Sequence, residues 1–349
     1  MNQEIKPWVL VSSIQKETKP IDLEMISPQI STLVDEWQSQ GKIMWSGAFD
    51  NQISSMAVFE ATEQEAKEFF KKYDLSVNLT ASDRSVFYAL FAGKKSISAI
   101  EQNNKKSWWK KILLTHYYYF DSTKHILLNN LQSLRLLKIK HDNIQQSLNI
   151  SDIVIANVKD KLNKIGIKEF IIFHPSAQYK YKIYPQHLRN ELLENLNKLG
   201  MPILITGSNG KIDVEIKASI PNLDNIFNWI GETTLEEYFA LSKLSSAYIG
   251  MDTLNMHIAA SQNKRIFAIY GPTKLSMWSP WSNDLQMSAI QDKPKQAYGN
   301  ITIFQADMSC VACGKAGCDD KHGKSECLDH ISPEDIFNEV KDWYQNAKF

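Results

Sequence analysis

Polar residues that could bind an anion gather in the segment 250–261, which has the sequence GMDTLNMHIAAS. A buried strand is predicted to end at Met251 and a helix to follow, so either Asp252 or Thr253 can cap that helix. The free N–H groups and positive end of the helix would form an anion site, which His257 could join. A capped helix that only packs its histidine fits the pattern as well, so the residue types leave both interpretations open.

Lys182 lies in the sequence YKYKIYP, shortly after the segment HPSA at positions 174–177. A lysine in this place can reach a phosphate bound at a neighbouring helix terminus through a charge-assisted contact. Without further context, a solvated surface lysine is the more common outcome. His174 is similarly more often a strand-end histidine that bonds the backbone than a base.

The cysteines form a cluster with the pattern C-x2-C-x4-C-x8-C. Four thiolates so close in sequence can hold a tetrahedral zinc ion, although the spacing differs from that of a standard zinc ribbon. Reduced or paired thiols are the alternative, and the scatter expected of a secreted disulfide scaffold is absent. The pattern therefore leaves a structural zinc site and ordinary thiols open for Cys310, Cys313, Cys318 and Cys327.

A basic and aromatic stretch, KKSWWKKILL, occupies positions 105–114. Lysines beside two tryptophans suit contact with anionic lipid headgroups. A solvated loop that packs its tryptophans on the domain is an equal alternative. The lysines of the first interpretation are Lys105, Lys106, Lys110 and Lys111.

Strands and helices alternate from about Ile153 to the C-terminus, which predicts a parallel sheet covered on both faces. The loops HPSA, TGSNG, GMDT and YGPT each follow a predicted strand. Ligands of such sheets bind beyond the carboxyl ends of the strands, so these loops should line one crevice. The expected strands are 169–177, 202–210, 247–251 and 265–273, and the expected helices are 185–200, 233–245 and 252–263.

The first part of the chain has the order βαββαβ, which is the ferredoxin-like α+β pattern. A long helix at 125–139 and a polar linker at 141–151 come before the alternating part. We therefore expect three domains, at 1–74, 75–150 and 151–349. In the first part, strands are expected at 8–14, 42–49, 53–61 and 75–82, and helices at 22–41 and 62–74.

The composition is that of a globular protein, with 43% hydrophobic and 22% charged residues in 349. Lys+Arg 39 balance Asp+Glu 39, which excludes nucleic-acid binding through bulk positive charge. No apolar run approaches the roughly 20 residues that span a bilayer, and the first residues lack the apolar core of a secretory signal. We therefore expect a cytoplasmic protein.

Up to about Asp74 the chain resembles the YCII-related domain family, through QGKIMWSGAF and SSMAVFEATEQEAKEFF. That family usually carries a histidine at the start of its first helix, as part of a proposed active site. This chain has SPQIS at positions 27–31 instead, which argues against isomerase or lyase chemistry of that kind.

From about Tyr73 onward the chain resembles glycosyltransferase family 9, the ADP-heptose:lipopolysaccharide heptosyltransferases, and most of all their heptosyltransferase III-like subgroup. The resemblance is carried by YDLSVNLTASDRS, HPSA with KIYP, ITGSNG, WIGETTLEEYFAL, GMDTLNMHIAA, YGPT, WSPW and the cysteine tail. It implies a GT-B-like architecture: a Rossmann-like C-terminal domain that binds the nucleotide-sugar donor, and an N-terminal α/β domain that is truncated here and fused to the ferredoxin-like segment.

The same resemblance assigns roles to individual residues. Ser176 and Lys182 would contact the donor diphosphate, and Asp252, Thr253 and His257 would line the nucleotide and phosphate pocket. Lysine and helix N–H groups can stabilise departing ADP, so no obligatory cofactor is implied. Two glycines, Gly207 and Gly271, would let the backbone approach the ligand.

The chain departs from the family at its beginning, where members carry a G-D-x-x-x-x-x-P loop whose aspartate is the presumed general base. This chain has VLVSSIQKETKPIDLEM there, which leaves the base unassigned, and Asp83 is only a candidate for contacting the acceptor. The implied function is heptose transfer from ADP-heptose to the lipopolysaccharide inner core, at the cytoplasmic face of the inner membrane. The alternative is a catalytically impaired nucleotide-sugar-binding or scaffold protein.

Overall fold

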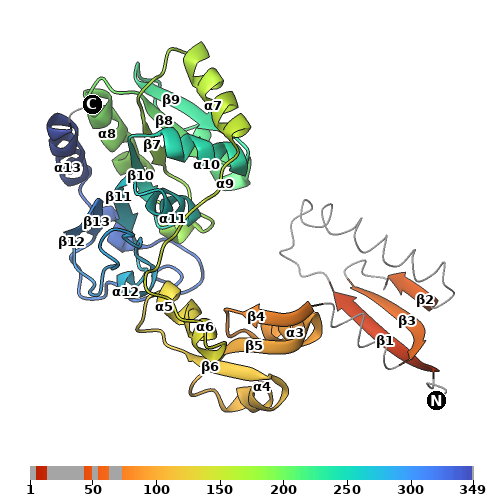
Figure 1. The fold of residues 1–349 in the computed structure, drawn as a ribbon. Coiled ribbons are helices and arrows are strands. Elements are labelled where there is room, and N and C mark those ends of the chain that lie inside the picture. Colours follow the sequence, from red (N-terminus) through yellow and green to blue (C-terminus); the bar gives the residue numbers. More distant parts are fainter. Residues whose placement is uncertain (1–4, 14–42, 49–53, 63–72, 348–349) are drawn as a thin grey trace. The chain divides into compact units, whose positions relative to one another are not determined.

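The structure is a computed structural model that describes residues 5–13, 43–48, 54–62 and 73–347. The chain divides into two units, residues 1–120 and 121–349, and each is considered by itself (Figure 1). No helix among the described residues is both long and apolar enough to span a bilayer.

The first sheet of unit 1 is antiparallel, with the strand order β1-β3-β2. Its strands confirm three of the predicted ones, and β1 pairs with β3 from Ile5↔Thr62 to Ser13↔Ser54. The predicted helix at 22–41 lies outside the described residues, as does the predicted helix at 62–74 except for its ends. The strands are β1 (Ile5–Ser13), β2 (Ile43–Ala48) and β3 (Ser54–Thr62).

The second sheet of unit 1 is parallel, with the order β4-β5-β6. The strand expected to complete the ferredoxin-like pattern pairs in parallel with β5 instead, and a helix connects the two strands. Tyr73 and Asp74 were predicted to end the helix at 62–74. They begin strand β4 instead, so the predicted end of that helix is wrong. The elements are β4 (Tyr73–Asn78), α3 (Asp83–Ala92), β5 (Gly93–Glu101), η1 (Lys105–Ser107), α4 (Trp108–Leu113) and β6 (His116–Phe120).

Unit 2 begins with short helices, and the predicted long helix at 125–139 is wrong. Two helices form instead, α5 (Ile126–Asn130) and α6 (Gln132–Leu136). The Asn129 side chain donates to the carbonyl oxygens of Asp121 and Lys124, and Ser133 Oγ donates to that of Asn130. Such side-chain bonds to the backbone compete with a continuous helical ladder, which explains the break.

A seven-stranded sheet with the order β12-β13-β11-β10-β7-β8-β9 forms the centre of unit 2, and all its strands except β12 are parallel. The predicted alternation of strands and helices is confirmed. The strands are β7 (Ile171–His174), β8 (Ile203–Gly207), β9 (Ile226–Ile230), β10 (Ala247–Met251), β11 (Arg265–Tyr270), β12 (Lys295–Tyr298) and β13 (Ile301–Gln305).

Helices cover both faces of this sheet, because alternate strand residues point to opposite faces. Phe173 belongs to the cluster under α8 and α13, whereas Ile172 belongs to the cluster under α7, α10 and α11. The helical elements are α7 (Asp152–Lys164), η2 (Lys180–Lys182), α8 (Gln186–Asn197), α9 (Lys211–Lys217), α10 (Leu235–Leu244), α11 (Leu254–Ser261), α12 (Leu275–Trp278), η3 (Glu326–His330) and α13 (Pro333–Asn346).

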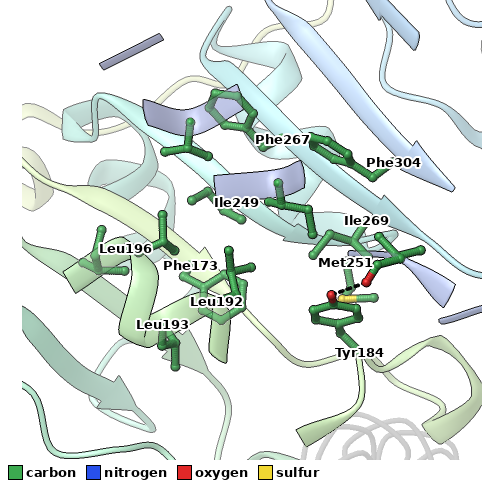
Figure 2. Close-up of a cluster of buried hydrophobic side chains, with 14 of the residues drawn as sticks. Phe173, Tyr184, Leu192, Leu193, Leu196, Ile249, Met251, Phe267, Ile269 and Phe304 are labelled. Atoms are coloured by element: carbon green, nitrogen blue, oxygen red, sulfur yellow. Dashed lines mark hydrogen bonds between the residues drawn. The ribbon is translucent and has the colours of Figure 1, made fainter. Parts of the chain in front are cut away.

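Figure 2 shows the first cluster, in which leucines of α8 pack on sheet residues such as Phe173 and Ile249. Tyr184 reaches the same core, where its hydroxyl donates to the Ile331 carbonyl oxygen at 2.5 Å. Burial raises the pKa of this phenol well above its usual value. The core thus ties the loop that carries Lys182 to the C-terminal segment.

We predict that Leu192→Ala lowers the free energy of unfolding of unit 2 by about 2–5 kcal/mol, because the fully buried side chain leaves a cavity. Urea unfolding of the full chain, with hydrogen exchange of the β7 and β8 amides as the readout for this sheet, measures the effect. Leu235→Ala is the matched control, since Leu235 is 55% exposed, and should change stability by less than about 0.5 kcal/mol. Equal effects of the two substitutions would contradict the assigned core.

Candidate functional site at the carboxyl edge of the unit 2 sheet

The predicted loops follow neighbouring strands of the sheet. After β7 the chain adds β8 and β9 on one side, then crosses back to place β10 on the other (Figure 1). The strand order therefore reverses between β7 and β10, and this is where ligands of open α/β sheets bind. His174 ends β7 and Met251 ends β10, so the HPSA and GMDT loops start beside each other.

An ion pair joins these two loop regions. Lys182 Nζ, from η2, lies 2.7 Å from the Asp252 Oδ2 atom that follows β10. The Asp252 side chain is 7% exposed and that of Lys182 is 25% exposed, so the carboxylate is buried beneath a lysine that still reaches solvent. The sequence predicted both residues as candidates, and the fold brings them together across 70 positions.

The N-terminus of α11 starts directly after Asp252. Thr253 is the N-cap residue, with extended backbone angles, but its side chain makes no cap hydrogen bond. The Asp252 carboxylate is bound to Lys182. The predicted cap position is thus confirmed for Thr253, whereas its predicted cap bond is wrong. The first N–H groups of α11 are not covered by the Thr253 hydroxyl and can meet an anion.

His257 is the fourth residue of α11 and is partly buried. Burial is the main cause that lowers its pKa to about 4. The Asp252 carboxylate acts in the opposite direction, and the charges of His125 and Lys182 lower the pKa further. With this lowered pKa the imidazole is in its neutral form at pH 7.

His174 is buried at the end of β7, where two polar side chains surround its ring. Thr206 Oγ1 and Asn255 Nδ2 lie 3.0 and 2.9 Å from His174 Nδ1. Burial lowers the pKa of this imidazole to about 4, against a raising effect of Asp213. Sequence reasoning missed Thr206 and Asn255, although Asn255 stands three residues after Asp252 in the same motif.

Three further predicted residues lie in the same loops, and their ligand contacts stay predictions. Ser176 is buried, at 3% exposure, after β7. Gly207 ends β8, and a Cβ atom there would lie 2.5 Å from Asp213 Oδ1. The Asp213 carboxylate therefore fills the space beside this glycine. A Cβ atom at Gly271 would meet the Leu328 side chain at 3.3 Å.

The predicted acceptor-side residue, Asp83, belongs to unit 1 and is the first residue of α3. Its carboxylate lies 2.7 Å from Lys110 Nζ, which also lies 2.9 Å from Glu101 Oε2. Burial would lower the pKa of Lys110, but the two carboxylates outweigh it and raise this pKa. For Glu101, burial is the largest single effect and raises the pKa, but hydrogen bonds from Lys110, Ser107 and the backbone together outweigh it, so this pKa is lowered. The prediction that Lys110 contacts lipid is therefore wrong, because its side chain is fully buried.

The cysteine segment carries free thiols in the structure, and Cys327 is the buried one. Burial, with the other three cysteines as lesser causes, raises the pKa of Cys327 to about 11. Cys318 Sγ accepts a hydrogen bond from the Glu326 N–H at 3.3 Å. Over residues 73–347, no three His, Cys, Asp or Glu side chains are grouped to hold a metal ion, and zinc remains a prediction from the spacing alone.

The fold and this site define a class: an α/β protein with a ligand site at the switch point of a parallel sheet. The model of glycosyltransferase family 9 (heptosyltransferase) matches residues 66–303, and the chain belongs to this family. The first 65 residues lie outside the match, so the YCII-related resemblance stays a prediction.

Curated relatives match at low identity. Lipooligosaccharide heptosyltransferase 2 of Campylobacter jejuni is 26% identical over 42% of this chain and 41% of its own length. Lipopolysaccharide heptosyltransferase 3 of Escherichia coli K12 is 23% identical over 46% of this chain and 48% of its own length. The chain thus spans about half the length of the curated relatives it matches.

Solved structures support the fold. A family 9 glycosyltransferase from Veillonella parvula superposes with a TM-score of 0.62 at 16% identity, covering 78% of this chain and 74% of that one. The ADP-heptose lipopolysaccharide heptosyltransferase II of E. coli gives 0.60 at 18% identity, covering 81% and 80%. The chain therefore has the α/β fold with parallel sheets seen in heptosyltransferase structures.

We predict that His257 and His174 stay neutral down to about pH 5 in the folded protein, because burial lowers both pKa values to about 4. Their folded pKa lies below the unfolded value of 6.5, so the unfolded chain binds more protons between these values. Stability contributed by the neutral rings is present above pH 6.5 and is lost as the pH falls toward 4.

NMR titration of the imidazole signals measures this, with His257→Gln and His174→Gln for assignment. The urea-unfolded chain is the reference, in which both rings should titrate near 6.5. Titration of either ring near 6.5 in the folded protein would contradict the assigned burial.

Proposed function

We propose that the protein is a glycosyltransferase that moves heptose from ADP-heptose to a sugar of the lipopolysaccharide inner core, at the cytoplasmic face of the inner membrane. The observation that carries the proposal is the Lys182–Asp252 pair beside the N-terminus of α11, at the switch point of the sheet. Family membership supports it. So do two relatives, which are named heptosyltransferases, and an E. coli heptosyltransferase solved with ADP.

Lys182 is the group best suited to the donor diphosphate. Its ammonium is held by one carboxylate and is still partly exposed, so it can exchange Asp252 for a phosphate oxygen without leaving the loop. The uncapped N–H groups of α11 add a second set of donors to the same anion. Ser176, two residues after the end of β7, has a hydroxyl that can join them.

Transfer would proceed by attack of an acceptor hydroxyl oxygen on the anomeric carbon of heptose. The new carbon–oxygen bond forms as the bond from that carbon to the β-phosphate oxygen breaks, and ADP departs with the electron pair. Lys182 and the helix N–H groups would stabilise the charge that develops on the phosphate. Neutral His257 could donate a hydrogen bond without adding charge.

The hydroxyl proton needs a base, for which this chain offers no family aspartate. Asp83 comes after β4, Glu101 ends the neighbouring parallel strand β5, and their side chains are 67% and 38% exposed. Asp83 remains the candidate for contact with the acceptor. The pKa of Glu101 is lowered, with the Lys110 hydrogen bond among the causes, so this carboxylate is a weaker base than an unpaired one.

A second candidate function is nucleotide-sugar binding without transfer. One observation favours it: β1 belongs to a separate antiparallel sheet, and the segment that follows it lacks the Gly-Asp pair. A chain with this N-terminal part could retain the donor site of unit 2 while lacking the catalytic base.

We predict that Lys182→Ala weakens ADP binding about 10- to 100-fold, because a charge-assisted hydrogen bond is lost. Isothermal calorimetry with ADP measures the affinity. Lys180→Ala is the matched control, since Lys180 is an exposed lysine two positions away that pairs with Glu215, and it should bind as the wild type does.

ADP release with ADP-heptose and a core oligosaccharide then separates the two candidate functions. Turnover supports the transferase, whereas tight ADP-heptose binding without turnover supports the binding protein. Absence of ADP binding in the wild type, or equal binding by the Lys182 and Lys180 variants, would contradict both.

A further inference from the structure

The helix α4 of unit 1 buries a lysine and exposes several of its apolar side chains. Its lysine, Lys110, is fully buried, whereas Trp108, Ile112 and Leu113 are 64%, 68% and 56% exposed. A surface helix normally buries its apolar residues and exposes its charges. Large apolar side chains that lie together on a surface indicate contact with an apolar partner.

Inward contacts fix this orientation of the helix. Lys110 Nζ donates to the Ala81 carbonyl oxygen at 2.5 Å and pairs with Asp83 and Glu101. The Trp109 ring stacks on Phe87 with 4.7 Å between centroids. Rolling the helix to bury Trp108 would pull the buried Lys110 ammonium away from these three oxygen partners. The apolar surface is therefore built into the fold.

The charges around this surface are positive. Lys105, Lys106 and Lys111 are exposed, and the sequence from Gln102 to Thr115 contains no acidic residue. Lys111 Nζ lies 5.3 Å from the ring centroid of Tyr119, another exposed aromatic residue. Tryptophan and tyrosine favour the interface of a bilayer, and lysines beside it favour anionic headgroups.

We propose that the α4 surface, defined as Lys105, Lys106, Trp108, Lys111, Ile112 and Leu113, binds the surface of a bilayer that contains anionic phospholipid. Trp108, Ile112 and Leu113 enter the region between headgroups and acyl chains, while the lysines bind the phosphates. Charge complementarity selects this partner, because apolar side chains beside lysines match the apolar and anionic layers of such a bilayer. Lys110 takes no part, since its buried ammonium bonds only groups of the protein itself.

Co-sedimentation of the full chain with vesicles tests the role of charge. We expect binding to phosphatidylcholine vesicles that contain phosphatidylglycerol, and little binding to phosphatidylcholine alone. The triple variant K105Q/K106Q/K111Q should lower the partition coefficient at least about tenfold, since each lysine near an anionic surface contributes about fivefold. The control K159Q/K164Q/K168Q removes three exposed lysines of unit 2 and should bind as the wild type does.

A second pair of variants tests insertion. W108S/I112S keeps every lysine and should also lower binding at least about tenfold, whereas I153S, which removes an isoleucine of α7 that is 72% exposed, should not. All three residue changes are at exposed side chains, so thermal melting should be unaltered.

The outcomes are decisive for the proposal. No binding of the wild type to anionic vesicles would overturn it, as would equal binding by either α4 variant and its control. If the lysine variant lost vesicle binding but W108S/I112S did not, the contact would rest on charge attraction alone, which an acidic protein surface would also provide. That result would overturn insertion into the bilayer. The vesicles contain no sugar acceptor or donor, so the result is independent of the proposed transfer.

Discussion

The parallel pairing of β7 with β10 is the constraint on which the candidate site depends. It joins strands separated by more than 70 residues and leaves their carboxyl ends side by side. Lys182 and Asp252 can then meet at 2.7 Å, next to the start of α11. The helices on both faces of the sheet stabilise this pairing, because each strand buries alternate apolar residues on both sides.

Two lysines that are both held by carboxylates have different roles because their surroundings differ. Lys182 lies above one buried aspartate and reaches solvent, and for this reason we propose that a phosphate replaces its partner. Lys110 is fully buried between Asp83 and Glu101, where both carboxylates raise its pKa. Its ion pairs hold α4 in an orientation that exposes tryptophan and isoleucine. A buried charge in one place thus determines an apolar surface in another.

Much of the fold could be predicted from the sequence because strands and helices of unit 2 have strong apolar patterns with glycine and proline at their ends. The helix at 125–139 was wrong because side chains such as Asn129 bond the backbone locally, which periodicity does not reveal. Thr206 and Asn255 were missed because their importance lies in the distance to His174. The predicted lipid contact of Lys110 was wrong because the burial of this side chain depends on its ion pairs with Glu101 and Asp83, which are 9 and 27 positions away.

The sequence by itself determined the parallel architecture of unit 2, the loops that follow its strands and the candidates Lys182, Asp252, Thr253 and His257. These depend on local patterns of polarity and on residue types, which can be read one segment at a time. Only the tertiary structure decided which candidates meet, which histidines are neutral and which lysine of the KKSWWKKILL stretch is internal. The physical reason is that distance, burial and electrostatic coupling arise between segments that only strand pairing and core packing bring together.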